Sequence, residues 1–167
     1  MMGNYMKKLL TSLGMAGALA LSAQPVLAQD IEAARAASAA GDYEAALAQL
    51  RPLAERGDAE AQTYIGAMYA AGEGVAQDYG EAARLLRLAA EQGFAKAQYN
   101  LGVMYATGQG VTQDMVRAYL WFDLAAALGD DNGRRYRDMA AWSLSPAQIA
   151  EAKRLATQCQ ARDYQGC

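Results

Sequence analysis

The chain has 167 residues, of which 53% are hydrophobic and 20% are charged, and its formal net charge at neutral pH is −3. This acidic balance argues against nucleic acids and anionic membrane surfaces as the main partners. The sequence contains no histidine, which excludes imidazole acid–base catalysis and the catalytic groupings in which histidine activates a serine or a cysteine.

Residues 1–28 have the three parts of a secretory signal peptide. Lys7 and Lys8 give a basic start, residues 9–21 are apolar or small, and Val26-Leu27-Ala28 ends with the small side chains that signal peptidase accepts. The apolar run is too short to span a bilayer as a helix, although an uncleaved amphipathic start or membrane anchor is the alternative. We predict cleavage after Ala28 and export, to the periplasm or the medium if the source is bacterial, with no membrane anchor remaining.

Residues 29–167 are long enough for one domain that folds unaided, and their middle part repeats itself. The segment Ala59–Gly93 aligns without a gap with Ala95–Gly129, and many of the aligned residues are identical. A fixed period of about 36 residues is typical of stacked helix pairs rather than of one closed globule.

The first expected pair is a helix over residues 30–40 and a second helix over residues 42–57. Each complete repeat then begins with a helix that ends at a Gly-x-Gly loop, because glycine adopts the conformations that such a turn needs. Asp78 and Asp114 precede the second helices and are expected to cap them, and Glu81 is expected to complete a capping box. In the second repeat Trp121 and Phe122 replace two leucines, and we expect these aromatic side chains to pack against alanines.

The last expected pair consists of a helix over residues 131–142 and a helix that starts at Ser145-Pro146, a strong start signal. We therefore predict an all-α solenoid of about four antiparallel helix pairs. The predicted units cover about residues 30–57, 58–93, 94–129 and 130–158, and a tail follows at residues 159–167.

Cys159 and Cys167 are the two cysteines of the chain. In an oxidising compartment this isolated pair is expected to form a disulfide that ties the tail to the last helix. A redox or metal-binding pair is the alternative, but two thiolates without any histidine make a poor metal site. We expect no metal and no cofactor.

The repeats resemble the Sel-one-like repeat (SLR) family, a branch of the tetratricopeptide-like solenoids. Both copies follow the pattern A-x-x-x-L-G-x-x-Y-x-x-G-x-G-V-x-x-D-x-x-x-A almost throughout, as in Ala97, Leu101, Gly102, Tyr105, Gly108, Gly110, Val111, Asp114 and Ala118. The resemblance implies a right-handed α-superhelix whose first helices line the concave side. It also implies a role as an adaptor or scaffold for other proteins.

If the first helices line a groove, the positions that the core stripe leaves free are expected to face it. These are Thr63 in the first complete repeat, Tyr99 and Val103 in the second, and Arg135 and Met139 in the last pair. Tyrosine, methionine and arginine are common at binding hot spots. Trp142 belongs to the same set, but it is also expected to cover the end of the core, and the arginines of residues 134–137 are equally consistent with a solvated helix face.

We therefore expect a monomeric interaction module that binds a protein or peptide segment in a concave groove, not an enzyme. The alternative is a cell-wall or β-lactam-binding hydrolase, as described for a cysteine-rich branch of the family. In that branch each repeat has its own disulfide, whereas both complete repeats here lack cysteine.

Overall fold

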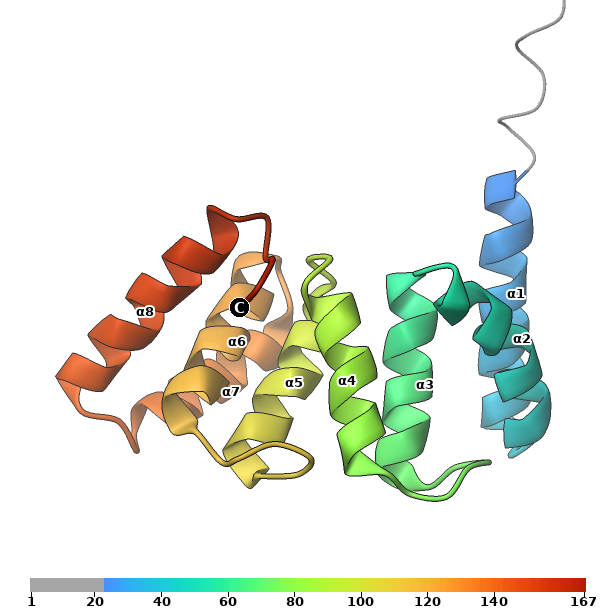
Figure 1. Cartoon of the computed structure of the whole chain (residues 1–167), viewed down its shortest axis with the longest axis horizontal. Helices are drawn as coiled ribbons and strands as arrows, with labels where there is room; N and C mark the ends of the chain where they lie inside the picture. The colour runs from blue at the N-terminus through green and yellow to red at the C-terminus, as the bar shows by residue number, and fades with distance from the viewer. Residues whose placement is uncertain (1–22) are drawn as a thin grey trace, which may run out of the picture.

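The computed structural model describes residues 23–167, and side chains from residue 30 onward. Most of the predicted signal peptide therefore lies outside the described residues. Eight helices follow one another in this part of the chain (Figure 1): α1 (Ala23–Ala39), α2 (Tyr43–Glu55), α3 (Ala59–Ala71), α4 (Tyr79–Ala90), α5 (Ala95–Thr107), α6 (Met115–Ala127), α7 (Asp131–Ala141) and α8 (Pro146–Gln160). The predicted all-α architecture is confirmed.

Helix α1 begins at Ala23, earlier than the expected start at residue 30. Pro25 lies in its first turn, where the missing N–H of proline removes no helical hydrogen bond. The predicted cleavage site after Ala28 therefore falls inside α1. None of the described helices combines the length and the hydropathy that crossing a membrane requires.

The helices stack as a curved row in which each helix from α1 to α7 packs on its neighbours in the chain (Figure 1). The first helices also contact one another, since α3 touches α5 and α5 touches α7, whereas α4 and α6 have no comparable contact. The closer approach of the first helices places α3, α5 and α7 on the inner side of the curve, as the resemblance implied.

The last two helices depart from the expected pairing. Both α7 and α8 pack on α6, and they have no comparable contact with each other; in Figure 1, α8 lies obliquely across the end of the row. Helix α7 buries only Gly133 and Ala140, so it offers α8 little apolar surface. The apolar side of α8, formed by Ala152, Ala156 and Cys159, joins the core around α6 instead. The fourth unit is therefore not a hairpin like the others.

Two hydrophobic clusters hold the stack together. One joins α1 to α4 around Leu50 and Leu53, and the other joins α4 to α8 around the fully buried Trp121 and Phe122. Buried alanines belong to the same cluster as these aromatic side chains. The ring of Phe122 lies against Gly102, where an added Cβ would come within 2.6 Å of it.

The Gly-x-Gly loops join each repeat to the one before it. An added Cβ on Gly110 would lie 2.0 Å from the carbonyl oxygen of Tyr79, and one on Gly74 would lie 2.6 Å from the Cβ of Tyr43. Each loop thus sits on the start of the preceding second helix. Both glycines also have a positive φ, which other residues adopt only at a cost.

The predicted helix caps are confirmed, with one correction. The carboxylates of Asp78 and Asp114 accept backbone hydrogen bonds at the starts of α4 and α6. Glu81 does not complete a capping box, because its carboxylate accepts two hydrogen bonds from Arg84 on the next turn.

Candidate functional site

The exposed side of the first helices forms one surface, which we call the inner wall. It is made of side chains of α3, α5 and α7 that are exposed or only partly buried: Tyr64, Ala67, Lys96, Tyr99, Val103, Arg135, Met139 and Trp142. The turn residue Phe94 borders it between α4 and α5. The predicted Tyr99, Val103, Arg135 and Met139 all belong to this surface.

A small pocket of about 60 Å³ opens in the inner wall between α3 and α5, with Tyr64, Phe94 and Lys96 among its lining residues. Lys96 holds its ammonium group 5.4 Å from the centre of the Tyr64 ring, and the guanidinium of Arg35 lies 5.5 Å from the same ring. Cations at this range from an aromatic ring are attracted to it. The pocket therefore brings aromatic side chains next to Lys96, and Glu60, which also lines it, is paired with Arg35.

Thr63 also lines this pocket, but it is almost fully buried. Its side chain is 2% exposed, and its hydroxyl donates a hydrogen bond of 2.7 Å to the carbonyl oxygen of Ala59. A short side chain whose hydroxyl is satisfied within its own helix has little surface to offer a partner. The expectation that Thr63 faces an open groove is therefore corrected.

An aromatic cluster connects α5, α6 and α7. The ring of Tyr99 lies 6.0 Å from Phe122 and 5.3 Å from Tyr136, measured between ring centres. Burial raises the pKa of Tyr99 above its ordinary value, so its hydroxyl stays neutral at physiological pH. Because Tyr99 is packed between these rings, it anchors α7 as well as contributing to the inner wall.

The three arginines of α7 differ in their pairing. Arg134 forms an ion pair with Asp131, and Arg137 forms ion pairs with Asp123 and Asp138. Arg135 has no acidic partner among residues 30–167, and its guanidinium lies 5.3 Å from the ring centre of Tyr136. Of the predicted cluster, only Arg135 keeps its charge available.

Two exposed apolar side chains lie on the same side of α7 as Arg135. Met139 is 55% exposed and Trp142 is 92% exposed, and both follow Arg135 at helical spacing on one side of the helix. Trp142 therefore does not cover the end of the core, which was one of its two possible roles. A guanidinium, a thioether and an indole lie together on the surface.

Tyr64, Phe94 and Lys96 were missed by the sequence reasoning. The signal that was present is variation between repeats: Glu60 of the first repeat corresponds to Lys96 of the second. The two residues lie beside one pocket, which only the contact between α3 and α5 reveals.

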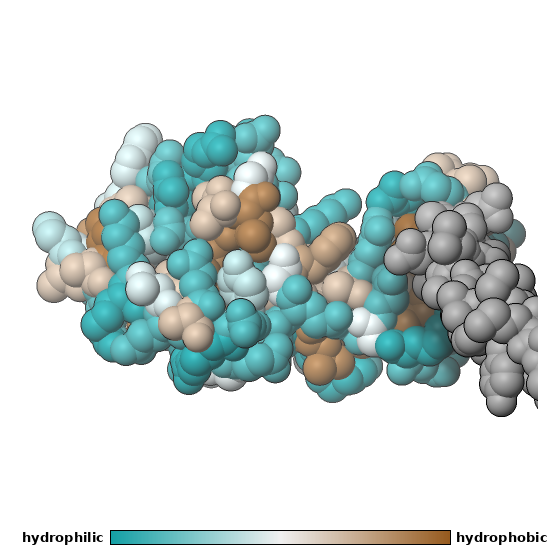
Figure 2. Space-filling model, turned by 90° about the horizontal axis from the view of Figure 1, so that it is seen from above, coloured by the Kyte–Doolittle hydropathy of each residue, from teal (hydrophilic) through white to brown (hydrophobic). Residues whose placement is uncertain are grey.

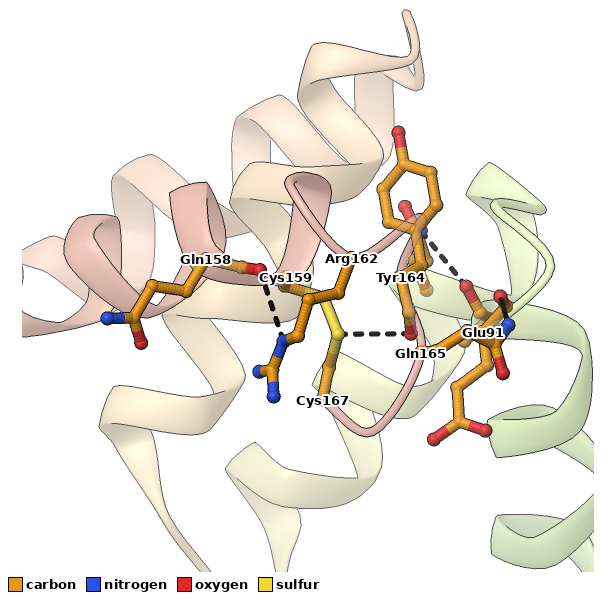
Figure 3. The surroundings of a disulfide bond; sticks show 9 residues. Glu91, Gln158, Cys159, Arg162, Tyr164, Gln165 and Cys167 are labelled. Carbon is orange, nitrogen blue, oxygen red and sulfur yellow. Dashed lines mark hydrogen bonds between the residues drawn. A yellow bond between two sulfur atoms is a disulfide. The ribbon is translucent and has the colours of Figure 1, made fainter.

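The predicted disulfide between Cys159 and Cys167 is present (Figure 3). The tail that it closes reaches further than expected, because the Gln165 amide donates a hydrogen bond of 2.7 Å to the carbonyl oxygen of Glu91. The Tyr164 ring lies over Gly93, where an added Cβ would come within 3.0 Å. The tail thus braces the turn between α4 and α5, next to Phe94.

Between residues 23 and 167, no group of three or more histidine, cysteine, aspartate or glutamate residues is arranged to hold a metal ion. The face seen from above is mostly hydrophilic and carries separate apolar patches (Figure 2). Recognition by exposed side chains is the chemistry that the inner wall offers.

Comparison with known proteins identifies the repeats. The family model described as Sel1 repeat matches residues 59–94 and 95–130. No curated protein matches the chain.

Two solved structures are similar to the chain. One is c5321, described as a protective antigen present in uropathogenic Escherichia coli strains and displaying an SLR fold; it has a TM-score of 0.78 and 29% identity over 84% of this chain and 31% of its own. The other is a Sel1 repeat protein from Oxalobacter formigenes, with a TM-score of 0.61 and 34% identity over 64% of this chain and 44% of its own. The chain spans less than half the length of either protein. With two Sel1 repeats in an all-α stack, the chain is a member of the Sel1-like repeat family.

Proposed function

We propose that the chain is an exported interaction module that binds a segment of a partner protein along its inner wall. Sel1 repeats commonly mediate protein–protein interactions, and the inner wall carries different side chains in the two repeats, such as Glu60 against Lys96 and Ala67 against Val103. The observation that carries the proposal is the stripe of Arg135, Met139 and Trp142, since adjoining exposed apolar side chains mark interaction sites, and tryptophan and arginine are enriched at binding hot spots.

Export is supported by the sequence of residues 1–28 and by the disulfide. Disulfides persist in oxidising compartments and are rare in reducing ones. A monomer is the form we propose, because the large hydrophobic side chains exposed on the described residues are few, namely Leu88, Leu128, Met139 and Trp142.

The test is capture from an envelope and secreted-protein fraction of the source organism, with the purified chain as bait and mass spectrometry as readout. The matched baits carry the triple change Arg135→Ala, Met139→Ala, Trp142→Ala on the inner wall, or the double change Leu88→Ala, Leu128→Ala. Leu88 lies in α4 and Leu128 directly follows α6. Both are exposed apolar residues, so they control for loss of apolar surface.

We expect the triple variant to lose the captured partner and the double variant to keep it, with unchanged helicity in both. Tyr99 is left intact because its removal would disturb the packing between α5 and α7. Equal capture by the wild-type chain and the triple variant would contradict the proposal.

A further inference from the structure

We propose that the inner wall selects an acidic segment that also carries an aromatic or long aliphatic side chain. This inference rests on the proposed function, because it names the chemistry of the partner segment that the inner wall would hold.

Most charged side chains on α3, α5 and α7 are already neutralised by a neighbour. Glu60 is paired with Arg35, and the acidic residues of α7 are paired with Arg134 and Arg137. Among the described residues of these three helices, Lys96 and Arg135 are left without an acidic partner. The free charges of the inner wall are therefore both positive, although the whole chain is net acidic.

Both cations are held in place by aromatic rings rather than by carboxylates. Lys96 lies over Tyr64 and Arg135 over Tyr136, at 5.4 and 5.3 Å from the ring centres. An ion pair with a partner would therefore displace no internal ion pair. Carboxylates suit this arrangement because a guanidinium can donate two parallel hydrogen bonds to one of them.

Each cation also has apolar surface beside it. The pocket next to Lys96 is lined by Tyr64 and Phe94, and Met139 and Trp142 follow Arg135 on α7. A segment with carboxylates alone would leave these surfaces in water, and a purely apolar segment would leave the cations unpaired. A segment that combines both kinds of side chain pairs with the cations and also covers the apolar surfaces of the inner wall.

Lys96 lies on α5 and Arg135 on α7, two first helices that contact each other. A segment that runs along the row of first helices therefore meets both cations.

The experiment selects peptides from a displayed library of random sequences of about twelve residues, with the purified chain produced from the full sequence as the target. The affinities of the selected peptides are then measured by tryptophan fluorescence. The chain has two tryptophans, and Trp121 is fully buried while Trp142 is 92% exposed. A peptide on the inner wall therefore changes the emission of Trp142.

We expect the selected peptides to be enriched in aspartate and glutamate together with an aromatic or long aliphatic residue. Replacing their carboxylates with amides should weaken binding about tenfold, and so should the double variant Lys96→Glu, Arg135→Glu. The control Lys153→Glu reverses an exposed lysine on α8 and should leave the affinity unchanged.

Neutral or basic selected peptides, or an amide version that binds as tightly as the acidic one, would overturn the inference and leave the proposed function standing. A library without any binder would also overturn it. The proposed function itself fails only if the capture experiment is insensitive to the inner-wall triple variant, so the two failures are distinguishable.

Discussion

The two complete repeats share one backbone plan and differ in how they fill it. In both, a loop glutamine closes the Gly-x-Gly turn. The side-chain amide of Gln77 donates a hydrogen bond of 2.9 Å to the carbonyl oxygen of Ala70, and that of Gln113 donates one of 2.8 Å to the carbonyl oxygen of Ala106. The second helix of the first repeat presents Leu86 to the core, whereas that of the second presents Phe122. Residues that are identical in the two repeats build the turns, and residues that differ set the packing and the exposed chemistry.

The largest loss of folding stability is expected from substitutions of the loop glycines. Gly110→Ala should destabilise the fold by more than about 3 kcal/mol, because the new Cβ meets the backbone of the preceding repeat, which cannot move alone. Gly74→Ala should cost less, about 2 kcal/mol, since its closest contact, 2.6 Å to the Cβ of Tyr43, is less severe than the 2.0 Å contact at Gly110. Urea unfolding of both variants measures the two losses of stability, and equal losses would show that the contact distance is not what distinguishes the loops.

Gly66 and Gly102 are helix glycines that face the second helix of their own repeat. Gly102→Ala should cost about 2 kcal/mol, because the Cβ would lie 2.6 Å from the rigid Phe122 ring. At Gly66 the nearest atom is the Cγ of Leu86 at 3.0 Å, and the higher helix propensity of alanine, worth about 1 kcal/mol, offsets the strain. Thermal unfolding should place Gly66→Ala near the wild type. A larger loss for Gly66→Ala than for Gly102→Ala would contradict this account of the packing.

A buried glutamine has a hydrogen-bond partner for its side-chain oxygen in the first repeat, but within residues 30–167 the corresponding glutamine of the second repeat lacks one. In the first repeat, the Gln62 amide donates to the carbonyl of Ala54 and its oxygen accepts 2.9 Å from Gln92. In the second, Gln98 donates to Ala90, but its buried oxygen has no partner among the described residues. The residue corresponding to Gln92 is Leu128.

Leu128→Gln should therefore stabilise the fold by about 1 kcal/mol by supplying the missing donor, and Gln92→Leu should destabilise it by about the same amount. Chemical denaturation of the two single variants tests both signs. Changes of the same sign in the two variants would show that the missing donor does not matter.

The smallest effect is expected from the ion pair at the start of α4. The hydrogen bonds from Arg84 lower the pKa of Glu81, so this pair stabilises the fold above the ordinary pKa of glutamate, and the contribution is lost as the pH falls through the lowered value. The side chain of Arg84 is 56% exposed and that of Glu81 is 31% exposed. This exposure limits the contribution of the ion pair to folding stability to less than about 0.5 kcal/mol.

Glu81→Gln should therefore be slightly less stable than the wild type at neutral pH, and the two should converge as the pH falls through the lowered pKa of Glu81. Urea unfolding across this range measures the difference. A gap that widens in acid would contradict the assignment.

The fold could be predicted because its determinants are local and repeated. The capping aspartates, the loop glycines and the alternation of alanine with large apolar residues are visible as spacings in the sequence. The packing of α8 on α6 instead of α7 depends on how little apolar surface α7 presents, which is a property of two helices together. The capping role of Glu81 was mispredicted because Arg84 competes for the same carboxylate.

The inner wall could be predicted only in part. Elimination of the core stripe placed Tyr99, Val103, Arg135 and Met139 on its side of the stack, because a helix has few faces. The burial of Thr63 depends on the neighbouring helix, and the free charge of Lys96 depends on which charged side chains find partners in space. Ion pairing between elements is not encoded by the repeat period.

The most direct test of the central claim is site-specific photo-crosslinking in the source organism. A photoreactive amino acid at Met139 or Ala67 on the inner wall should form a covalent adduct with the partner, and the same group at Leu88 or Leu128 should not. Adducts from Leu88 and Leu128, with none from the inner-wall positions, would contradict recognition by the first helices.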